Sequence, residues 1–195
     1  MSLMCLLAVV CALGSVWAQV PPSKAEIGSI QVYMTAEEAQ AKIFPAFAST
    51  RLEVKAVPVV LKGQIEDQLG RRFAEDSLRV RLLYDAGDRF LGYAIVTEEI
   101  GKYRPITFMV GIDPHFRVEA AAVLVYRESR GGQVRRSRFL RQYRGKSSAD
   151  PIRINRDIIN ISGATLSVRS LNFGVRKLLY LTEALYGPAS LGARR

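Results

Sequence analysis

The stretch Ser162-Gly163-Ala164-Thr165-Leu166-Ser167 stands directly before a long run of helical periodicity. Apolar residues recur there at the spacing of one helix face, until Gly187-Pro188 supply a stop. Ser162 is a suitable N-cap, so the pattern predicts a helix with Thr165 at its start. N–H groups of the first turn favour a phosphate at that position, and Gly163 and Ala164 would keep the hydroxyl accessible. The apolar positions are Leu166, Leu171, Val175, Leu178, Leu179, Leu181 and Leu185.

Upstream of this helix, the sequence alternates between apolar and polar residues in four segments. Residues 78–84 and 90–96 flank a turn at 85–88, and residues 106–112 and 117–126 are joined through Asp113-Pro114, which predicts two β-hairpins. Earlier patterns predict a short strand at 29–33, a helix at 35–44 that begins with a capping box, an extended or loop-like segment at 51–60 and a short helix at 62–69. The expected fold is α+β, with a mainly antiparallel sheet and flanking helices.

Residues 1–18 carry no charge and contain the apolar run 6–13, which is typical of a secretory signal peptide. An uncleaved N-terminal anchor is the alternative, because the segment is short for a membrane span and lacks a basic start. We therefore expect one domain over 19–195, exported to the periplasm or to the outer face of the cytoplasmic membrane. A chain of 195 residues with 49% apolar residues suffices for a single core of ordinary size.

The composition excludes several chemistries. Both cysteines, Cys5 and Cys11, lie in the predicted leader, so the mature chain would have no disulfide, thioether-linked haem or cysteine nucleophile. The single histidine, His115, follows Asp113-Pro114 and is interpreted as a turn residue, so neither a metal site nor a catalytic residue is assigned. The net charge of +10 fits an anionic surface or an acidic partner, whereas export and the lack of a recognisable motif argue against nucleic acid.

Three motifs in chain order carry a resemblance to a known family. Glu128-Ser129-Arg130-Gly131-Gly132 resembles the Glu-Thr-Pro-Gly-Leu-Gly run of flavin subunits from sodium-pumping and Rnf-type respiratory complexes. The second motif, 139–146, resembles an aromatic-Gln-aromatic-Gly-Lys segment, and the third, 162–167, resembles a flavinylation signature. The chain thus resembles the FMN-binding domain family over about 91–186. Asp157 lies slightly upstream of the place where the family usually has an acidic residue, which Ile159 and Asn160 occupy here.

The resemblance implies that Thr165 carries FMN through a phosphoester bond. It further implies an electron carrier rather than a stand-alone enzyme, loaded by a flavin transferase and paired with a membrane redox partner. Physically, a Gly-Gly backbone can approach a flat ring, Glu128 or Ser129 can bind its polar edge, and Phe139 or Tyr143 can stack on it. The cofactor-binding set implied is Thr165, Ser162, Gly163, Ala164, Leu166, Ser167, Glu128, Ser129, Gly131, Gly132, Phe139, Gln142 and Lys146.

The sequence leaves two alternatives open. A module that binds FMN without a covalent bond is one, because of the shifted acidic residue. A basic cell-envelope protein without flavin is the other, and it rests on the net charge and on the basic residues between 135 and 146. Those basic residues either stabilise the negative charge of a flavin or form a solvated surface.

Overall fold

The computed structural model describes residues 28–188, and the predicted leader therefore lies outside the described residues. Six strands form one sheet in the order β1-β6-β5-β4-β3-β2, and every neighbouring pair is antiparallel. The strands are β1 (Gln31–Val32), β2 (Ser49–Ala56), β3 (Ser77–Tyr84), β4 (Phe90–Ile100), β5 (Pro105–Ile112) and β6 (Val118–Tyr126). The helices are α2 (Ala36–Ile43), α3 (Val59–Leu69), α4 (Ser137–Leu140) and α5 (Thr165–Tyr186), with 3-10 turns η1 (Gly132–Arg135) and η2 (Arg141–Tyr143). The α+β prediction is confirmed.

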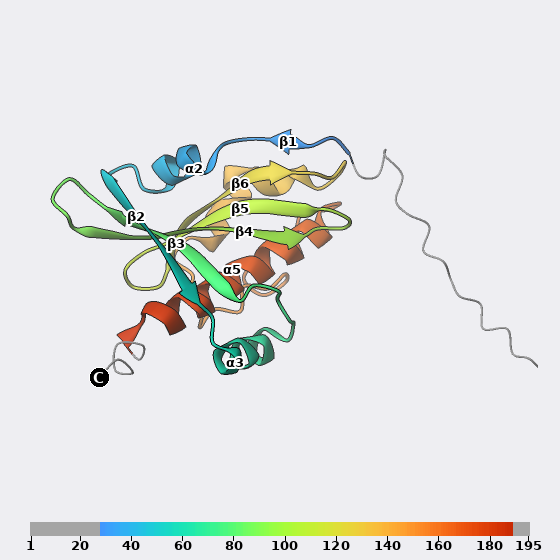
Figure 1. Cartoon of the computed structure of the whole chain (residues 1–195). Helices are drawn as coiled ribbons and strands as arrows, with labels where there is room; N and C mark the ends of the chain where they lie inside the picture. The colour runs from blue at the N-terminus through green and yellow to red at the C-terminus, as the bar shows by residue number, and fades with distance from the viewer. Residues whose placement is uncertain (1–27, 189–195) are drawn as a thin grey trace, which may run out of the picture.

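The sheet separates two hydrophobic clusters. Helix α2 covers one face, where Ile43 and Phe44 pack with Leu83 and Met109. Helix α5 crosses the other face and buries Leu171, Val175, Leu178 and Leu179 against the larger cluster (Figure 1). The periodicity of α5 thus produces a helix that is buried over most of its length, and its first residue, Thr165, lies near the end of β6 that leads into η1.

Most predicted elements are present, with shifted ends. The capping box at Thr35 and Glu38 forms, and the 85–88 and 113–116 turns close their hairpins. Of the segment 51–60, predicted to be extended or loop-like, the part up to Ala56 belongs to the edge strand β2, which pairs along its whole length with β3. Helix α3 begins at Val59, three residues earlier than predicted, since Pro58 precedes it and has no N–H to be left unpaired.

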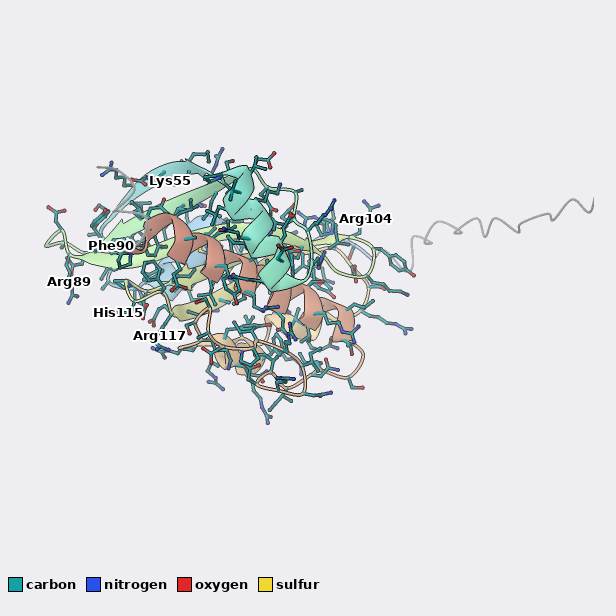
Figure 2. All side chains as sticks on the ribbon, turned by 90° about the horizontal axis from the view of Figure 1, so that it is seen from below. Lys55, Arg89, Phe90, Arg104, His115 and Arg117 are labelled. Carbon is teal, nitrogen blue, oxygen red and sulfur yellow. The ribbon has the colours of Figure 1, made fainter. Side chains whose placement is uncertain are left out.

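His115 lies in the β5–β6 turn, as predicted, and is exposed. Figure 2 shows it beside Arg117, at the end of the sheet opposite Arg104 of the β4–β5 turn. No helix within residues 28–188 is long and apolar enough to cross a membrane, and no group of potential metal ligands forms in that part of the chain.

Candidate functional site

Thr165 is the first residue of α5, so the prediction of its place at a helix start is confirmed. Its side-chain oxygen accepts a hydrogen bond from Asn160 Nδ2 at 2.9 Å. The other amide atom of Asn160, Oδ1, is buried and has no hydrogen-bond partner among the described residues. A buried acceptor without a partner is costly unless a ligand satisfies it. Asn160 therefore orients the threonine hydroxyl and leaves one polar atom for a bound group.

The residues just before Thr165 form a turn rather than a cap. Ala164 N donates to Ile161 O. Gly163 has φ +78°, and because this left-handed conformation is not helical, the helix cannot begin at Ser162. The prediction of Ser162 as N-cap is wrong, because Ala164 occupies that position and no side chain caps the helix.

Of the two small residues before Thr165, Gly163 lies in open space and Ala164 is buried. A Cβ at Gly163 would meet nothing within 4 Å, so this position is open as predicted. Ala164 is instead 3% exposed and belongs to the core, which contradicts its predicted part in the approach. Leu166 remains 45% exposed beside the threonine.

The glycine pair lies against the first turn of α5. Gly131 has φ +91°, and a Cβ there would come within 2.7 Å of Ser167 Oγ. The Tyr126 hydroxyl lies 2.9 Å from Ser167 Oγ and donates to the carbonyl oxygen of Arg130. Burial raises the pKa of Tyr126, so its hydroxyl stays protonated as a donor. The first and third sequence motifs, 128–132 and 162–167, are thus brought together, and Ser167 joins them.

Two hollows open next to neighbours of Thr165, although Thr165 itself lines neither, and Gln133 and Arg136 line both. One, of about 350 Å³, includes Asn160, and the other, of about 410 Å³, includes Gly163. Neither has an acidic residue in its lining, and four arginines contribute to the pair: Arg130, Arg135, Arg136 and Arg138. The first is lined by Gln133, Arg136, Arg138, Phe139, Gln142, Ile159, Asn160 and Ile161, and the second by Gln31, Tyr33, Ser129, Arg130, Gly131, Gly132, Gln133, Arg135, Arg136 and Gly163. The surroundings of Thr165 suit an anionic ligand with a flat organic part.

Glu128 is engaged elsewhere. Its carboxylate accepts hydrogen bonds from the backbone N–H groups of Tyr103 (2.6 Å) and Arg104 (3.0 Å), and the residue is only 6% exposed. It fastens the β4–β5 turn to the end of β6. The interpretation of Glu128 as a hydrogen-bonding group for a ring edge is therefore contradicted by its contacts, whereas Ser129 lines the second hollow.

The two aromatic residues proposed for stacking belong to the core. Tyr143 is fully buried and donates to Asn172 Oδ1 at 2.7 Å, and burial raises its pKa. Phe139 packs edge-on against it, with ring centroids 5.7 Å apart. Stacking of a ligand on Tyr143 is thus excluded by its burial. Phe139 is 4% exposed and presents its remaining surface to the first hollow.

Gln142 and Lys146 shape the loop that carries Asn160. Gln142 Oε1 accepts from Ile159 N at 2.7 Å, which fixes the residue next to Asn160. Lys146 Nζ lies 2.8 Å from Asp157 Oδ2, and the backbone N–H groups of Ile152 and Arg153 also donate to this carboxylate. Burial acts to raise the pKa of Asp157, but these hydrogen bonds outweigh it and lower the pKa. Gln142, Lys146 and Asp157 therefore stabilise the loop, and none of their hydrogen bonds is to Thr165.

The basic residues between 135 and 146 are mostly solvated. Arg136, Arg138, Arg141 and Arg144 are exposed, and the exposed Arg135 places its guanidinium 4.6 Å from the centre of the Tyr33 ring.

Sequence reasoning missed Tyr33, Gln133 and the role of Asn160. Tyr33 follows β1, nearly a hundred residues before the glycine pair, and no local pattern connects them. The role of Asn160 could have been predicted, because this polar residue stands close to the place where the family usually has an acidic residue.

Comparisons with known proteins bear on the family that this chain resembles. Residues 101–180 match the family model of the FMN-binding domain. No curated protein matches this chain. The crystal structure of Shewanella oneidensis NqrC matches with a TM-score of 0.48 and 14% identity, over 69% of this chain and 79% of that chain. The family match spans the glycine pair and Thr165, so the resemblance of this part of the chain to the FMN-binding domain family is confirmed.

Proposed function

We propose that this protein is an electron-transfer flavoprotein that carries FMN through a phosphoester on Thr165 Oγ1. The observation that carries the proposal is the hydroxyl of Thr165, which is oriented by Asn160 at the start of α5 and lies beside two hollows lined by arginine. FMN, when bound, supplies one- and two-electron chemistry.

The residues present fit this cofactor. Helix-start N–H groups and the arginines favour the phosphate, and Asn160 Oδ1 is a buried acceptor in need of a donor. Gly163 leaves the hydroxyl open to a modifying enzyme. In the attachment step, the threonine oxygen bonds to phosphorus, the hydroxyl proton is lost, and the leaving group departs from an activated FMN donor that a flavin transferase must supply.

Export, a cleaved leader and a membrane redox partner belong to the same proposal. Export and a leader rest on the apolar, uncharged residues 1–18, and the membrane redox partner rests on the resemblance to the FMN-binding domain family. A covalent bond would keep the cofactor on a protein outside the cell, where no supply of free flavin is at hand.

Noncovalent FMN binding is the second candidate, and one observation favours it. Asn160 stands near the place where the family usually has an acidic residue, and Asp157 is held by Lys146 instead of approaching Thr165. In this case the same hollows would hold FMN, and denaturation would release it.

The test is co-expression with a flavin transferase in an exporting host, followed by intact mass and in-gel fluorescence after denaturation. We expect a gain of one FMN less one water in the parent chain and in Ser162→Ala, the matched control, because Ser162 forms no cap and its hydroxyl belongs to the same motif. Thr165→Val should show no gain. Covalent flavin retained in Thr165→Val would refute the attachment site, whereas yellow native protein with an unmodified mass would favour noncovalent binding. A colourless protein that binds anionic surfaces in a salt-sensitive way would favour the envelope role.

A further inference from the structure

A third hollow, of about 340 Å³, lies along α5 and shares no lining residue with the two beside Thr165. The loop 152–155 forms one wall, and one face of α5 forms the other. Its lining comprises Ile152, Arg153, Ile154, Asn155, Arg169, Asn172, Phe173 and Arg176. Seen from below, α5 runs between α3 on one side and the segments that follow β6 on the other (Figure 2).

Three arginines line this hollow without an acidic partner. None of Arg153, Arg169 and Arg176 takes part in an ion pair within residues 28–188, and no carboxylate lines the hollow. The nearest loop carboxylate, Asp157, is already bound by Lys146 and two backbone N–H groups. Positive charges that line one hollow without a carboxylate favour the binding of an anion there.

Arg176 provides a second, independent observation. One of its terminal nitrogens donates to the carbonyl oxygen of Gln68 in α3 at 3.2 Å, so α3 holds the side chain in place. Its Nε is buried and has no hydrogen-bond partner among the described residues. A buried donor on a charged group is rarely left unsatisfied unless a ligand or an ion completes it.

The backbone of the loop 152–155 is held in one conformation by its own hydrogen bonds. Ile152 and Asn155 both have positive φ (44° and 63°), which non-glycine residues rarely adopt. The carbonyl oxygen of Arg153 accepts from three N–H groups, those of Arg156, Asp157 and Ile158, and this fixes the residue at the rim. The arginine on the loop therefore faces α5 from a preorganised backbone.

We propose that this hollow binds a phosphate group through Arg153, Arg169 and Arg176. Guanidinium groups match phosphate oxygens with paired, charge-assisted hydrogen bonds. The volume exceeds that of inorganic phosphate, and Phe173 and Ile154 offer apolar surface for an organic part of the ligand. Two sources have this chemistry: a free phosphate or phosphomonoester, and the headgroup of an anionic phospholipid.

This site is separate from the flavin ester, although Arg169 lies one helical turn after Thr165. Asn160 and Gly163, which line the two hollows near Thr165, are absent from its lining. The inference does not rest on flavinylation. It is tested with two full-length proteins: the Thr165→Val variant, which has no hydroxyl to esterify, and the FMN-loaded parent chain.

The first experiment titrates both proteins with inorganic phosphate at low salt in a calorimeter. We expect saturable binding in both. Arg169→Gln and Arg153→Gln should each weaken it about tenfold or more, as expected when one charge-assisted hydrogen bond is removed. Arg79→Gln, an exposed arginine on β3 without an ion pair, is the matched control and should bind like the parent. Equal affinities in Arg169→Gln and Arg79→Gln, or binding that disappears on FMN loading, would overturn the separate site.

A second arm separates the sources with vesicles of phosphatidylglycerol and phosphatidylcholine, and of phosphatidylcholine alone. Weaker sedimentation of Arg169→Gln than of Arg79→Gln with the anionic vesicles assigns the lipid headgroup. Equal sedimentation, together with arginine-dependent phosphate binding in solution, assigns a free phosphate compound. The proposal would be refuted if the protein showed no phosphate binding and no arginine-specific effect on vesicle sedimentation.

Discussion

The charges along α5 differ between the face that packs on the sheet and the face that turns to the 152–155 loop. On the sheet side, Lys177 is 2% exposed and its Nζ lies 2.7 Å from Glu99 Oε1, with Glu75 as a further partner. On the loop side, Arg169 and Arg176 have no carboxylate partner within the described residues. Charges that are matched inside the protein maintain the fold, whereas charges left unmatched at a hollow are available to a ligand.

The sheet side is a small network rather than a single pair. Arg71 also approaches Glu99, at 3.8 Å, and its guanidinium lies 4.2 Å from the centre of the Phe173 ring. Burial raises the pKa of the Glu99 carboxyl, and Lys177 and Arg71 oppose that rise. Hydrogen bonding to Lys177 lowers the pKa of Glu75 despite the opposing effect of burial. The network connects α5 to β4 and to the segment before β3.

Removal of the buried cation is the strongest way to test this contrast. Lys177→Met would leave Glu99 buried without its main partner, so we expect a loss of about 3 to 5 kcal/mol in the free energy of unfolding. Arg169→Met, on the exposed side of the same helix, should change it by less than about 0.5 kcal/mol. Urea denaturation measures both. The double variant Lys177→Met/Glu99→Leu should recover most of the loss, and a loss below about 1 kcal/mol in Lys177→Met would show that the pair does not stabilise the fold.

The glycine pair allows a test of how the site is held to α5. Gly131→Val would place a side chain in a left-handed conformation and against Ser167 Oγ, 2.7 Å from the new Cβ. We expect a destabilisation of about 1 to 3 kcal/mol and a lower yield of flavin-loaded protein. Gly145→Val is the matched control, because it too has a positive φ (78°) but a Cβ there meets nothing within 4 Å. Equal flavin yields in the two variants would show that the close contact between Gly131 and Ser167 is not needed for cofactor binding.

Asn160 offers a test with a small effect on the fold. Asn160→Ala removes the hydrogen bond to Thr165 and the buried, unsatisfied Oδ1 together, so its effect on stability should remain within about 1 kcal/mol. We expect slower covalent loading, measured as the fraction of modified mass against time. Unchanged loading would mean that the transferase orients the hydroxyl without help from this chain.

The smallest expected effect concerns acid stability of the loop that carries Asp157. Since its pKa is lowered in the folded protein, the contribution of Asp157 is present above its unfolded pKa of about 3.9 and is lost as pH falls through the folded pKa. Unfolding free energy of the parent should therefore fall as pH drops below about 4, and Asp157→Asn should flatten that slope. An identical slope in both proteins would show that Lys146 and Asp157 do not couple to folding.

Local patterns predicted the elements of this protein well. The two hairpins follow from alternation and turn residues, and α5 from apolar spacing, because these signals repeat within two to four positions. The same signals misplace Ser162, since a cap and a turn use the same residue types and the choice depends on the positive φ of Gly163. Glu128 and Tyr143 were assigned to the ligand because their side chains are suitable, but a sequence does not show which groups are already paired inside the fold.

The sequence by itself determined an antiparallel α+β sheet, a helix start at Thr165 and motifs that resemble those of the FMN-binding domain family. Only the tertiary structure decided that Tyr126 joins the glycine loop to Ser167, that Glu128 fastens a distant turn, and that three arginines from loop and helix converge on one hollow. The reason is physical: secondary structure arises from interactions between near neighbours, whereas a site depends on which distant groups meet when the core closes and on which of their hydrogen bonds remain to be made.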